Sequence, residues 1–285
     1  MLAVNLGILF AYKYLDFVIA NLNRFMKTQI QPAGLALPIG ISFFTLQAVS
    51  YLIDVYRGVI KADNNIFRLA LFMSFFPQIV EGPICRYEQT ANQLWNVSKI
   101  EHSNLVQGSQ RILYGMMKKI VIADRLNPLI QEVFTNFLQY DGGIIAISAL
   151  CYTIQLYMEF SGTMDAVIGT AQIFGVTLPE NFSRPFFSKT ISDFWARWHI
   201  SLGAWFKDYI FYPVTLSKSV KNLTSKLKKK VGKYFSLIAA SAIALFCVWS
   251  CNGLWHGAAW NYIFFGMYHF VFNGKYCRTS YETCS

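Results

Sequence analysis

Of the 285 residues in this chain, 54% are hydrophobic and only 14% are charged, although the net charge is +10. A soluble domain carries about 25% charged residues, so this composition disfavours a large soluble enzyme and indicates an integral membrane protein. The net charge would also suit a nucleic-acid-binding protein. The placement of the positive charges decides between these two classes.

Seven lysines are concentrated in one segment directly before the apolar run from Tyr234 to Asn273. They are Lys218, Lys221, Lys226, Lys228, Lys229, Lys230 and Lys233. Lysine and arginine accumulate in the cytoplasmic loops of membrane proteins, where they contact anionic lipid headgroups. We therefore interpret residues 218–233 as a cytoplasmic loop and expect membrane lipid, and no nucleic acid, as a partner.

Apolar runs predict eight helices in chain order. They cover residues 2–20, 36–56, 66–80, 105–123, 143–160, 163–178, 234–251 and 255–273. The first run lacks the basic start and the cleavage site of a signal peptide, so we interpret it as a membrane segment. The uncharged run 234–273 could cross a bilayer twice at about 20 residues per span. The predicted fold class is an all-α, polytopic membrane protein.

Proline and glycine punctuate several of these helices: Pro38 opens the second, and Pro77 together with Pro83 breaks the chain after the third. Non-helical backbone at membrane depth is tolerated only where protein or a water-filled cavity covers it. The breaks therefore predict re-entrant segments around a cavity. Ordinary loop punctuation explains any one of them equally well.

The expected domain organisation is a single transmembrane domain over residues 1–274, followed by a polar tail over residues 275–285. The sequence contains no internal repeat of about 20 to 50 residues that would indicate a repeat architecture.

A helix at the membrane interface is expected in the more polar part of the chain. Ser192 is its expected N-cap, with Asp193 in the first turn and paired with Arg197 four residues later. The mixture of aromatic and basic residues is typical of a helix that lies at the interface.

His256 is the strongest candidate for catalysis among the four histidines. It lies inside the long uncharged run, where an ionisable side chain is costly and marks a functional site. An imidazole titrates at about pH 6.5, which suits proton transfer near neutrality. Asn252, one turn earlier, could hydrogen-bond the ring or line the same polar pocket. Gly253 and Gly257 would share a helix face open to a substrate or, as is common, to a neighbouring helix.

The other histidines have simpler explanations. His199 lies one turn after Trp195 at an expected membrane boundary, where an interfacial aromatic belt accounts for it. His102 is expected to be a solvated loop residue, and His269 a structural residue of the last apolar helix.

Other chemistries find less support. The six cysteines lack zinc-knuckle spacing, so we infer neither a disulfide nor a structural metal. Cys247, Cys251 and His256 have helical spacing that could bind a metal, but no fourth ligand lies nearby. Glu159 and Asp165 flank a Ser-Gly pair and could serve a pore or a proton relay. A helix–helix turn explains these two acids equally well.

Seven short motifs follow one another along the chain. They are Pro38–Phe44, Tyr51–Gly58, Phe76–Ile84, Gln155–Gly162, Pro179–Phe182, Asp193–Leu202 and Gly253–Gly257. The most specific are Asp-Phe-Trp-x-Arg-Trp-His-Ile-Ser-Leu and Gly-Leu-Trp-His-Gly. In this order the motifs resemble the membrane-bound O-acyltransferase (MBOAT) family, in the bacterial branch of alginate O-acetyltransferase and the teichoic-acid D-alanyl transfer protein.

The resemblance implies a ring of transmembrane and re-entrant helices around a central funnel, in the cytoplasmic membrane. It implies an enzyme that transfers acetyl toward hydroxyls of an extracytoplasmic cell-surface polysaccharide, with no bound cofactor. The donor would be a cytoplasmic thioester, acetyl-CoA or an acyl carrier protein, and an extracytoplasmic partner protein usually completes the transfer. The same resemblance makes His256 catalytic and His199 the second important histidine.

The implied mechanism has His256 as a general base on a hydroxyl, held neutral by burial in an aromatic pocket. The expected substrate-binding residues are Asn252, Trp255, Trp260, Trp195 and Arg197. Among them, Asn252 and the indoles of Trp255 and Trp260 could position groups or donate to the oxyanion. The lysines before the apolar run would attract an anionic donor.

Three alternatives stay open. D-Alanyl transfer to teichoic acid shares the core motifs, and a proton-coupled transporter could use His199, His256 and Glu159 as a path. An inactive scaffold that recruits a secreted partner is the third, because chains of the family are usually longer and this one has the pattern of a fragment. A helix rise of about 1.5 Å per residue puts His256 roughly 30 Å from Tyr234, at the far face, unless the segment tilts or re-enters.

Overall fold

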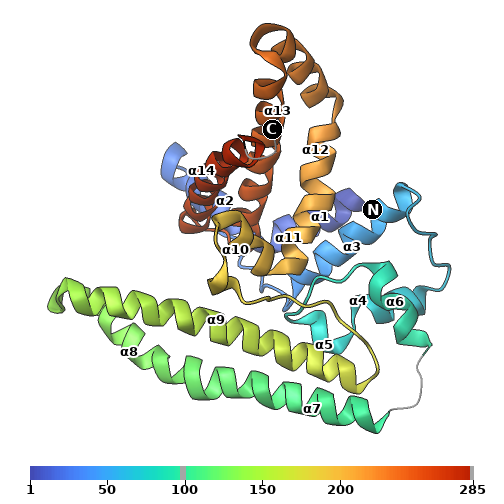
Figure 1. Cartoon of the computed structure of the whole chain (residues 1–285), viewed down its shortest axis with the longest axis vertical. Coiled ribbons are helices and arrows are strands. Elements are labelled where there is room, and N and C mark those ends of the chain that lie inside the picture. Colours follow the sequence, from blue (N-terminus) through green and yellow to red (C-terminus); the bar gives the residue numbers. More distant parts are fainter. Residues whose placement is uncertain (97–100, 283–285) are drawn as a thin grey trace. The chain divides into compact units, whose positions relative to one another are not determined.

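The computed structural model describes residues 1–96 and 101–282, with side chains up to residue 273, and this part of the chain is all-helical with no β-strand (Figure 1). Its contacts divide into two compact units. The middle unit comprises Lys61–Phe182, and the outer unit comprises Met1–Ile60 together with Ser183–Ser285. The single domain expected from the sequence stays a prediction.

The middle unit is built around one long helix with two partners. Its helices are α4 (Ile66–Met73), α5 (Phe76–Ile79), α6 (Tyr87–Trp95), α7 (His102–Met117), η1 (Lys118–Ala123, a π-helix), α8 (Asp124–Thr135), η2 (Phe137–Gln139) and α9 (Gly142–Ile173). Helix α9 lies alongside α7, η1 and α8 (Figure 1). A buried cluster that includes Phe72, Phe75, Leu94 and Ile168 joins the shorter helices to the end of α9.

Glycines allow α7 and α9 to approach closely. A Cβ atom on Gly108 would lie 2.6 Å from the carbonyl oxygen of Gly169, and one on Gly115 would lie 2.4 Å from that of Gly162. On each helix the two glycines are two turns apart and so share a face. Small residues at a helix–helix contact are typical of tightly packed membrane helices.

Helix α9 is continuous where the sequence suggested a break. The expected division into helices over 143–160 and 163–178 is wrong, because Ser161 and Gly162 are helical and buried. The close approach of Gly115 to Gly162 explains why a glycine is accommodated inside this helix.

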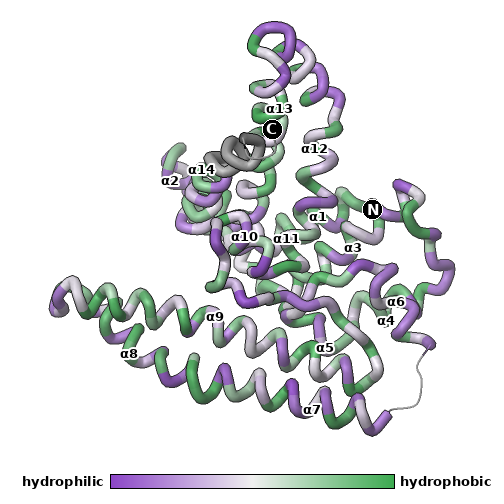
Figure 2. The backbone as a smooth tube through the Cα atoms, viewed as in Figure 1, coloured by the Kyte–Doolittle hydropathy of each residue, from purple (hydrophilic) through white to green (hydrophobic). Residues whose placement is uncertain are grey.

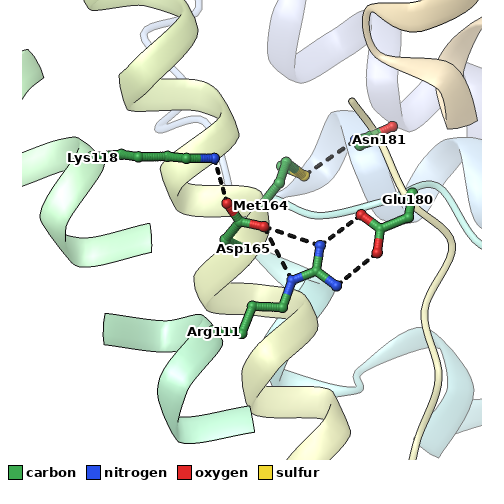
Figure 3. A network of polar contacts seen from close by, with 6 residues as sticks. All are labelled: Arg111, Lys118, Met164, Asp165, Glu180 and Asn181. Atoms are coloured by element: carbon green, nitrogen blue, oxygen red, sulfur yellow. Dashed lines mark hydrogen bonds and ion pairs between the residues drawn. The ribbon is translucent and has the colours of Figure 1, made fainter. Parts of the chain in front are cut away.

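The acidic residues of α9 pair with bases of α7 and η1 (Figure 3). Asp165 accepts hydrogen bonds from Lys118 Nζ at 2.6 Å and from Arg111 Nε at 3.1 Å. Arg111 also donates to both carboxylate oxygens of Glu180, at 2.7 and 2.6 Å. Glu159 pairs with Lys119 at 3.0 Å. These ion pairs give Glu159 and Asp165 a structural role. Neither a pore nor a helix–helix turn is needed to account for the two acids.

The outer unit contains the remaining helices. They are α1 (Leu2–Lys13), α2 (Leu15–Met26), α3 (Ile41–Tyr56), η3 (Pro185–Phe187), α10 (Ile191–Arg197), α11 (Ile200–Phe206), η4 (Lys207–Phe211, a π-helix), α12 (Tyr212–Leu216), α13 (Lys218–His256) and α14 (Trp260–Glu282). The first apolar run is therefore two helices, bent by 60° between Lys13 and Leu15. Residues 275–282 of the expected polar tail continue α14, and residues 283–285 lie outside the described residues.

The lysine-rich segment is helical. The expected cytoplasmic loop over 218–233 is not irregular in conformation, because α13 starts at Lys218 and its only non-helical residue is Gly232, with φ +89°. Glycine adopts this left-handed conformation without a steric penalty, so the chain can turn there. The hydrophilic lysine-bearing end and the hydrophobic remainder of α13 are distinct in Figure 2.

Within the described residues, two helices, α9 and α13, are long and apolar enough to cross a membrane, and the bent pair α1–α2 would be a third span. Helix α14 packs on the second half of α13 (Figure 1). Gly253 and Gly266 form that contact, because a Cβ on Gly253 would lie 2.5 Å from the carbonyl oxygen of Tyr262 and one on Gly266 would lie 2.4 Å from that of Trp249.

Candidate active site

His256 is the last residue of α13 and it is exposed. Its imidazole lies near three aromatic rings, with centroid distances of 5.0 Å to Trp255, 5.5 Å to Phe265 and 6.3 Å to Tyr262. The expected aromatic surroundings are present, but the expected burial is not. The ring is therefore reachable from outside the protein.

Trp255 brings the two candidate histidines together. Its indole lies 5.6 Å from the ring of His199 and 5.0 Å from that of His256, edge to face in both cases. Its Nε1 donates to the carbonyl oxygen of Ser42 at 3.4 Å, and Phe43 packs against it at 5.4 Å. Two segments that are far apart in the sequence thus share one aromatic side chain.

His199 is buried and has a left-handed backbone conformation, with φ +50°. It is the N-cap residue of α11, so the chain leaves α10 before reaching it. The spacing predicted that His199 would lie one turn after Trp195 on the same helix. The break between α10 and α11 separates the two residues instead. Burial lowers the pKa of His199 to about 3, and the nearby His256 adds a smaller effect in the same direction. The imidazole of His199 is neutral at physiological pH.

The end of α13 is held by the bend between α1 and α2, which the sequence analysis did not single out. Lys13 Nζ donates to the carbonyl oxygen of Trp255 and, at 2.7 Å, to Ser42 Oγ. The hydroxyl of Tyr14 donates to the carbonyl oxygen of Leu254 at 2.7 Å. The last carbonyls of a helix lack intrahelical partners, and these two side chains satisfy them. The only signal in the sequence was Lys13 itself, the one charge in α1.

Asn252 is buried one turn before His256, but its Oδ1 has no hydrogen-bond partner among the described residues. This oxygen therefore accepts no hydrogen bond from the His256 ring, which was one of the two roles that the sequence allowed for Asn252. Gly257 lies beyond the helix end, in an extended conformation, so it does not share a helix face with Gly253. A Cβ on Gly257 would lie 2.3 Å from the ring of Tyr262, which explains the glycine by packing.

Trp260 has its indole N–H engaged away from His256. It donates to Asn21 Oδ1 at 2.9 Å, and its ring packs against Phe17 of α2 at 6.0 Å. Trp260 is therefore poorly placed to supply the oxyanion donor that the sequence suggested.

Trp195 packs in an aromatic cluster with His269 at 4.8 Å and Trp249 at 5.0 Å. Arg197 pairs with Asp193 at 2.7 Å, which confirms the predicted contact four residues apart. The predicted N-cap Ser192 is wrong: α10 starts at Ile191, and the hydroxyl of Thr190 accepts from the backbone N–H of Asp193.

A metal site has no support in the described part of the chain, where no group of three His, Cys, Asp or Glu side chains could hold an ion. The groups available for chemistry are instead the imidazoles of His199 and His256, which both contact the indole of Trp255. The ammonium of Lys13 is hydrogen-bonded to the backbone carbonyl of the same tryptophan. The fold and these residues define an all-helical membrane protein with an imidazole available for proton transfer.

Comparison with known proteins identifies the family. The family model described as membrane-bound O-acyltransferase (MBOAT) matches residues 59–227, more than half of the chain, and the chain belongs to this family. The matched range includes His199 and stops before His256.

Curated relatives extend the similarity over most of the chain. A probable alginate O-acetylase of Azotobacter vinelandii is 34% identical over 93% of this chain and 50% of its own length. A peptidoglycan O-acetyltransferase of Helicobacter pylori is 31% identical over 94% of this chain and 53% of its own length. A teichoic acid D-alanyltransferase of Bacillus subtilis is 33% identical over 84% and 59%, respectively. The chain spans about half the length of the curated relatives it matches.

Proposed function

We propose that this chain acts as a multi-pass O-acyltransferase of the cytoplasmic membrane. It transfers acetyl from a cytoplasmic thioester, acetyl-CoA or an acyl carrier protein, toward hydroxyls of an extracytoplasmic cell-surface polysaccharide. Family membership and the O-acetyltransferases among the relatives support this reaction class. The ring of helices around a funnel and the extracytoplasmic partner protein, both expected from the resemblance, belong to the same proposal.

The observation that carries the proposal is the pair of histidines on Trp255. His256 is exposed at the end of an apolar helix, while His199 is buried beside the same indole. An ionisable group on a membrane helix is costly and marks a functional site. The exposed imidazole is the one that a substrate can reach, so we assign it the role of general base. His199 orients the shared indole and thereby the end of α13.

The proposed chemistry uses one proton acceptor. The imidazole of His256 takes the proton of the acceptor hydroxyl as the oxygen attacks the thioester carbonyl carbon. The new C–O bond forms, the C–S bond breaks, and the electron pair of that bond leaves on sulfur. The proton is then passed from the imidazolium to the thiolate, which restores the neutral base and releases the thiol.

The lysines at the start of α13 suit the donor side of this reaction. Coenzyme A and acyl carrier proteins are anionic, and a cluster of positive charge raises the local concentration of such ligands. The straight part of α13 from Lys233 to His256 extends roughly 35 Å at a rise of about 1.5 Å per residue. The lysines and His256 are thus at opposite ends of one span, so the thioester arm of a donor held at the lysines has to enter the protein to reach His256.

The test is an acetyl-transfer assay in membranes with labelled acetyl-CoA. Substituting His256→Ala should lower transfer by about 10²- to 10⁴-fold, the usual contribution of a general base. The substitution His102→Ala changes an exposed histidine of α7 and serves as the control, with wild-type transfer expected. Equal transfer by wild type and His256→Ala, at equal amounts of folded protein, would remove His256 from the reaction.

D-Alanyl transfer is the second candidate, favoured by the similarity to a teichoic acid D-alanyltransferase. The two reactions differ in the donor, so membranes supplied with labelled acetyl and D-alanyl thioesters in parallel separate them. Incorporation of D-alanine alone would replace acetyl transfer as the assigned reaction. Uptake of an ion or solute without any acyl transfer would instead support the transporter.

A further inference from the structure

Lys13 places a positive charge against the backbone of the proposed catalytic residue. Its Nζ is hydrogen-bonded to the carbonyl oxygen of Trp255, and that carbonyl carbon is bonded to the backbone nitrogen of His256. The ammonium also lies over the rings of Trp255 and Tyr14, at 5.8 and 5.9 Å from their centroids. No other residue of α1 is charged.

This ammonium has no carboxylate partner. In the part of the chain whose side chains are described, no Asp or Glu forms an ion pair with Lys13. Asp16, three residues later, instead accepts from the backbone N–H groups of Ala33 and Gly34, at 2.7 and 3.2 Å. An ammonium has three N–H donors, and two are used by Trp255 and Ser42. One N–H donor is left for an additional anion.

The two indole N–H groups near His256 are already hydrogen-bonded and are not available to an anion. The N–H of Trp255 is bound to the carbonyl oxygen of Ser42, and that of Trp260 to Asn21. Lys13 is therefore a cation beside His256 that has the capacity to compensate negative charge. Keeping an unpaired ammonium in apolar surroundings costs free energy of folding. Lys13 is therefore a candidate for a functional role.

We propose that Lys13 binds the sulfur of the departing thiolate during acyl transfer. The inference rests on the proposed function. The carbonyl oxygen is negative only transiently, whereas the sulfur carries a full charge from the moment that the C–S bond breaks until it takes the proton from the imidazolium. Thiols ionise at about pH 8.5 in water, and apolar surroundings make a free thiolate costlier still. A fixed ammonium offsets that cost.

The test compares two acetyl donors whose leaving groups differ in acidity. S-acetyl-N-acetylcysteamine releases an alkyl thiol, and S-phenyl thioacetate releases an aryl thiol, which is more acidic and leaves with little assistance. Substituting Lys13→Met should lower transfer from the alkyl thioester by about 10²-fold, comparable to losing one electrostatic donor. Transfer from the aryl thioester should fall by less than about tenfold. Lys13→Arg, which keeps the charge, should retain the wild-type ratio between the two donors.

The matched control is Tyr14→Phe. It removes the neighbouring hydrogen bond to the end of α13 without removing a charge, so any loss should be the same for both donors. An equal loss for both donors with Lys13→Met would overturn the proposal and leave Lys13 a helix cap. Lys13→Gln repeats the comparison if Lys13→Met does not accumulate as a folded protein in size-exclusion chromatography. If neither accumulates, a changed donor ratio in Lys13→Arg overturns the proposal, and an unchanged ratio supports it.

The outcomes separate this inference from the proposed function. Failure of the wild type to transfer acetyl from either donor overturns both. Transfer by the wild type that survives His256→Ala overturns the assignment of the base and leaves the comparison at Lys13 valid in its own right.

Discussion

His199 shows how one residue can combine an unusual backbone with an unusual titration. With a left-handed φ of +50° it is the N-cap residue of α11, and its side chain is buried against Trp255. Few residue types adopt this conformation readily, and asparagine and histidine are among them. Because asparagine tolerates the backbone, His199→Asn tests the side chain without forcing the chain to change direction.

The stability of the protein should depend on pH through His199. The folded-state pKa of His199, about 3, lies below the value of 6.5 for a free imidazole. Between these two pH values the unfolded chain binds a proton at His199 and the folded protein does not. Stability from this group is present above about pH 6.5 and is lost as the pH falls toward about 3. Thermal unfolding followed by tryptophan fluorescence at about pH 7.5 and pH 5 should show this loss in the wild type.

The variant His199→Asn should show a smaller loss of stability over the same pH interval, because it lacks the titrating group. The exposed residue His102 offers a control, and His102→Asn should keep the full wild-type pH dependence. A His199→Asn profile parallel to that of the wild type would contradict the assignment and place the acid sensitivity in other groups.

At the residue scale, the sequence predicted contacts between near neighbours and missed those between distant segments. The spacing of four predicted the pair Asp193–Arg197, which the structure confirms. It could not predict that Lys13 and Tyr14 cap a helix that ends at His256, because no local pattern couples positions so far apart. For the same reason the sequence could not show that the N–H of Trp260 donates to Asn21 of α2 and is unavailable to an oxyanion.

At the scale of elements, apolar runs located most helices, but packing decided where they end. Ser161 and Gly162 resemble a turn in the sequence, yet α9 passes through them because α7 packs against Gly162. Helices α6 and α8 were missed because the sequence search followed long apolar runs, and these helices carry mixed polar and apolar residues. Glycine pairs at spacing of seven on both α7 and α9 were the available signal, and recognising them requires the partner helix to be known.

The contact between α7 and α9 should tolerate no added methyl group. A glycine-to-alanine change inside a helix normally stabilises it by about 0.5–1 kcal/mol. At Gly115 the new Cβ would lie 2.4 Å from a backbone oxygen of α9, and such overpacking costs about 1–3 kcal/mol. Gly115→Ala should therefore lower the thermal unfolding temperature of the protein in detergent.

The control for this prediction is Gly142→Ala, at the start of α9, where a Cβ would meet nothing within 4 Å. That variant should unfold at the wild-type temperature or slightly above it. An unfolding temperature for Gly115→Ala at or above that of Gly142→Ala would show that the two helices are not in such close contact.

At the scale of the whole molecule, composition and motif order predicted more than periodicity did. The charge-poor composition indicated a membrane protein, and the ordered motifs indicated the family that the comparisons then established. The reaction could not have come from composition, because a lone imidazole on an apolar helix suits a transporter as well as a transferase. The ring around a funnel and the single domain stay predictions, since each unit is described only by its own contacts.

The orientation of α13 is the prediction on which the whole arrangement depends. The positive-inside rule places its lysine-rich end in the cytoplasm, so the opposite end, with His256, should face the extracytoplasmic side. In a cysteine-free background, Lys228→Cys should react with a membrane-impermeant maleimide only after the cells are permeabilised, whereas Ala258→Cys should react in intact cells. Labelling of both positions from the same side would mean that α13 does not cross the membrane, and the donor and the base would then have to meet on one face.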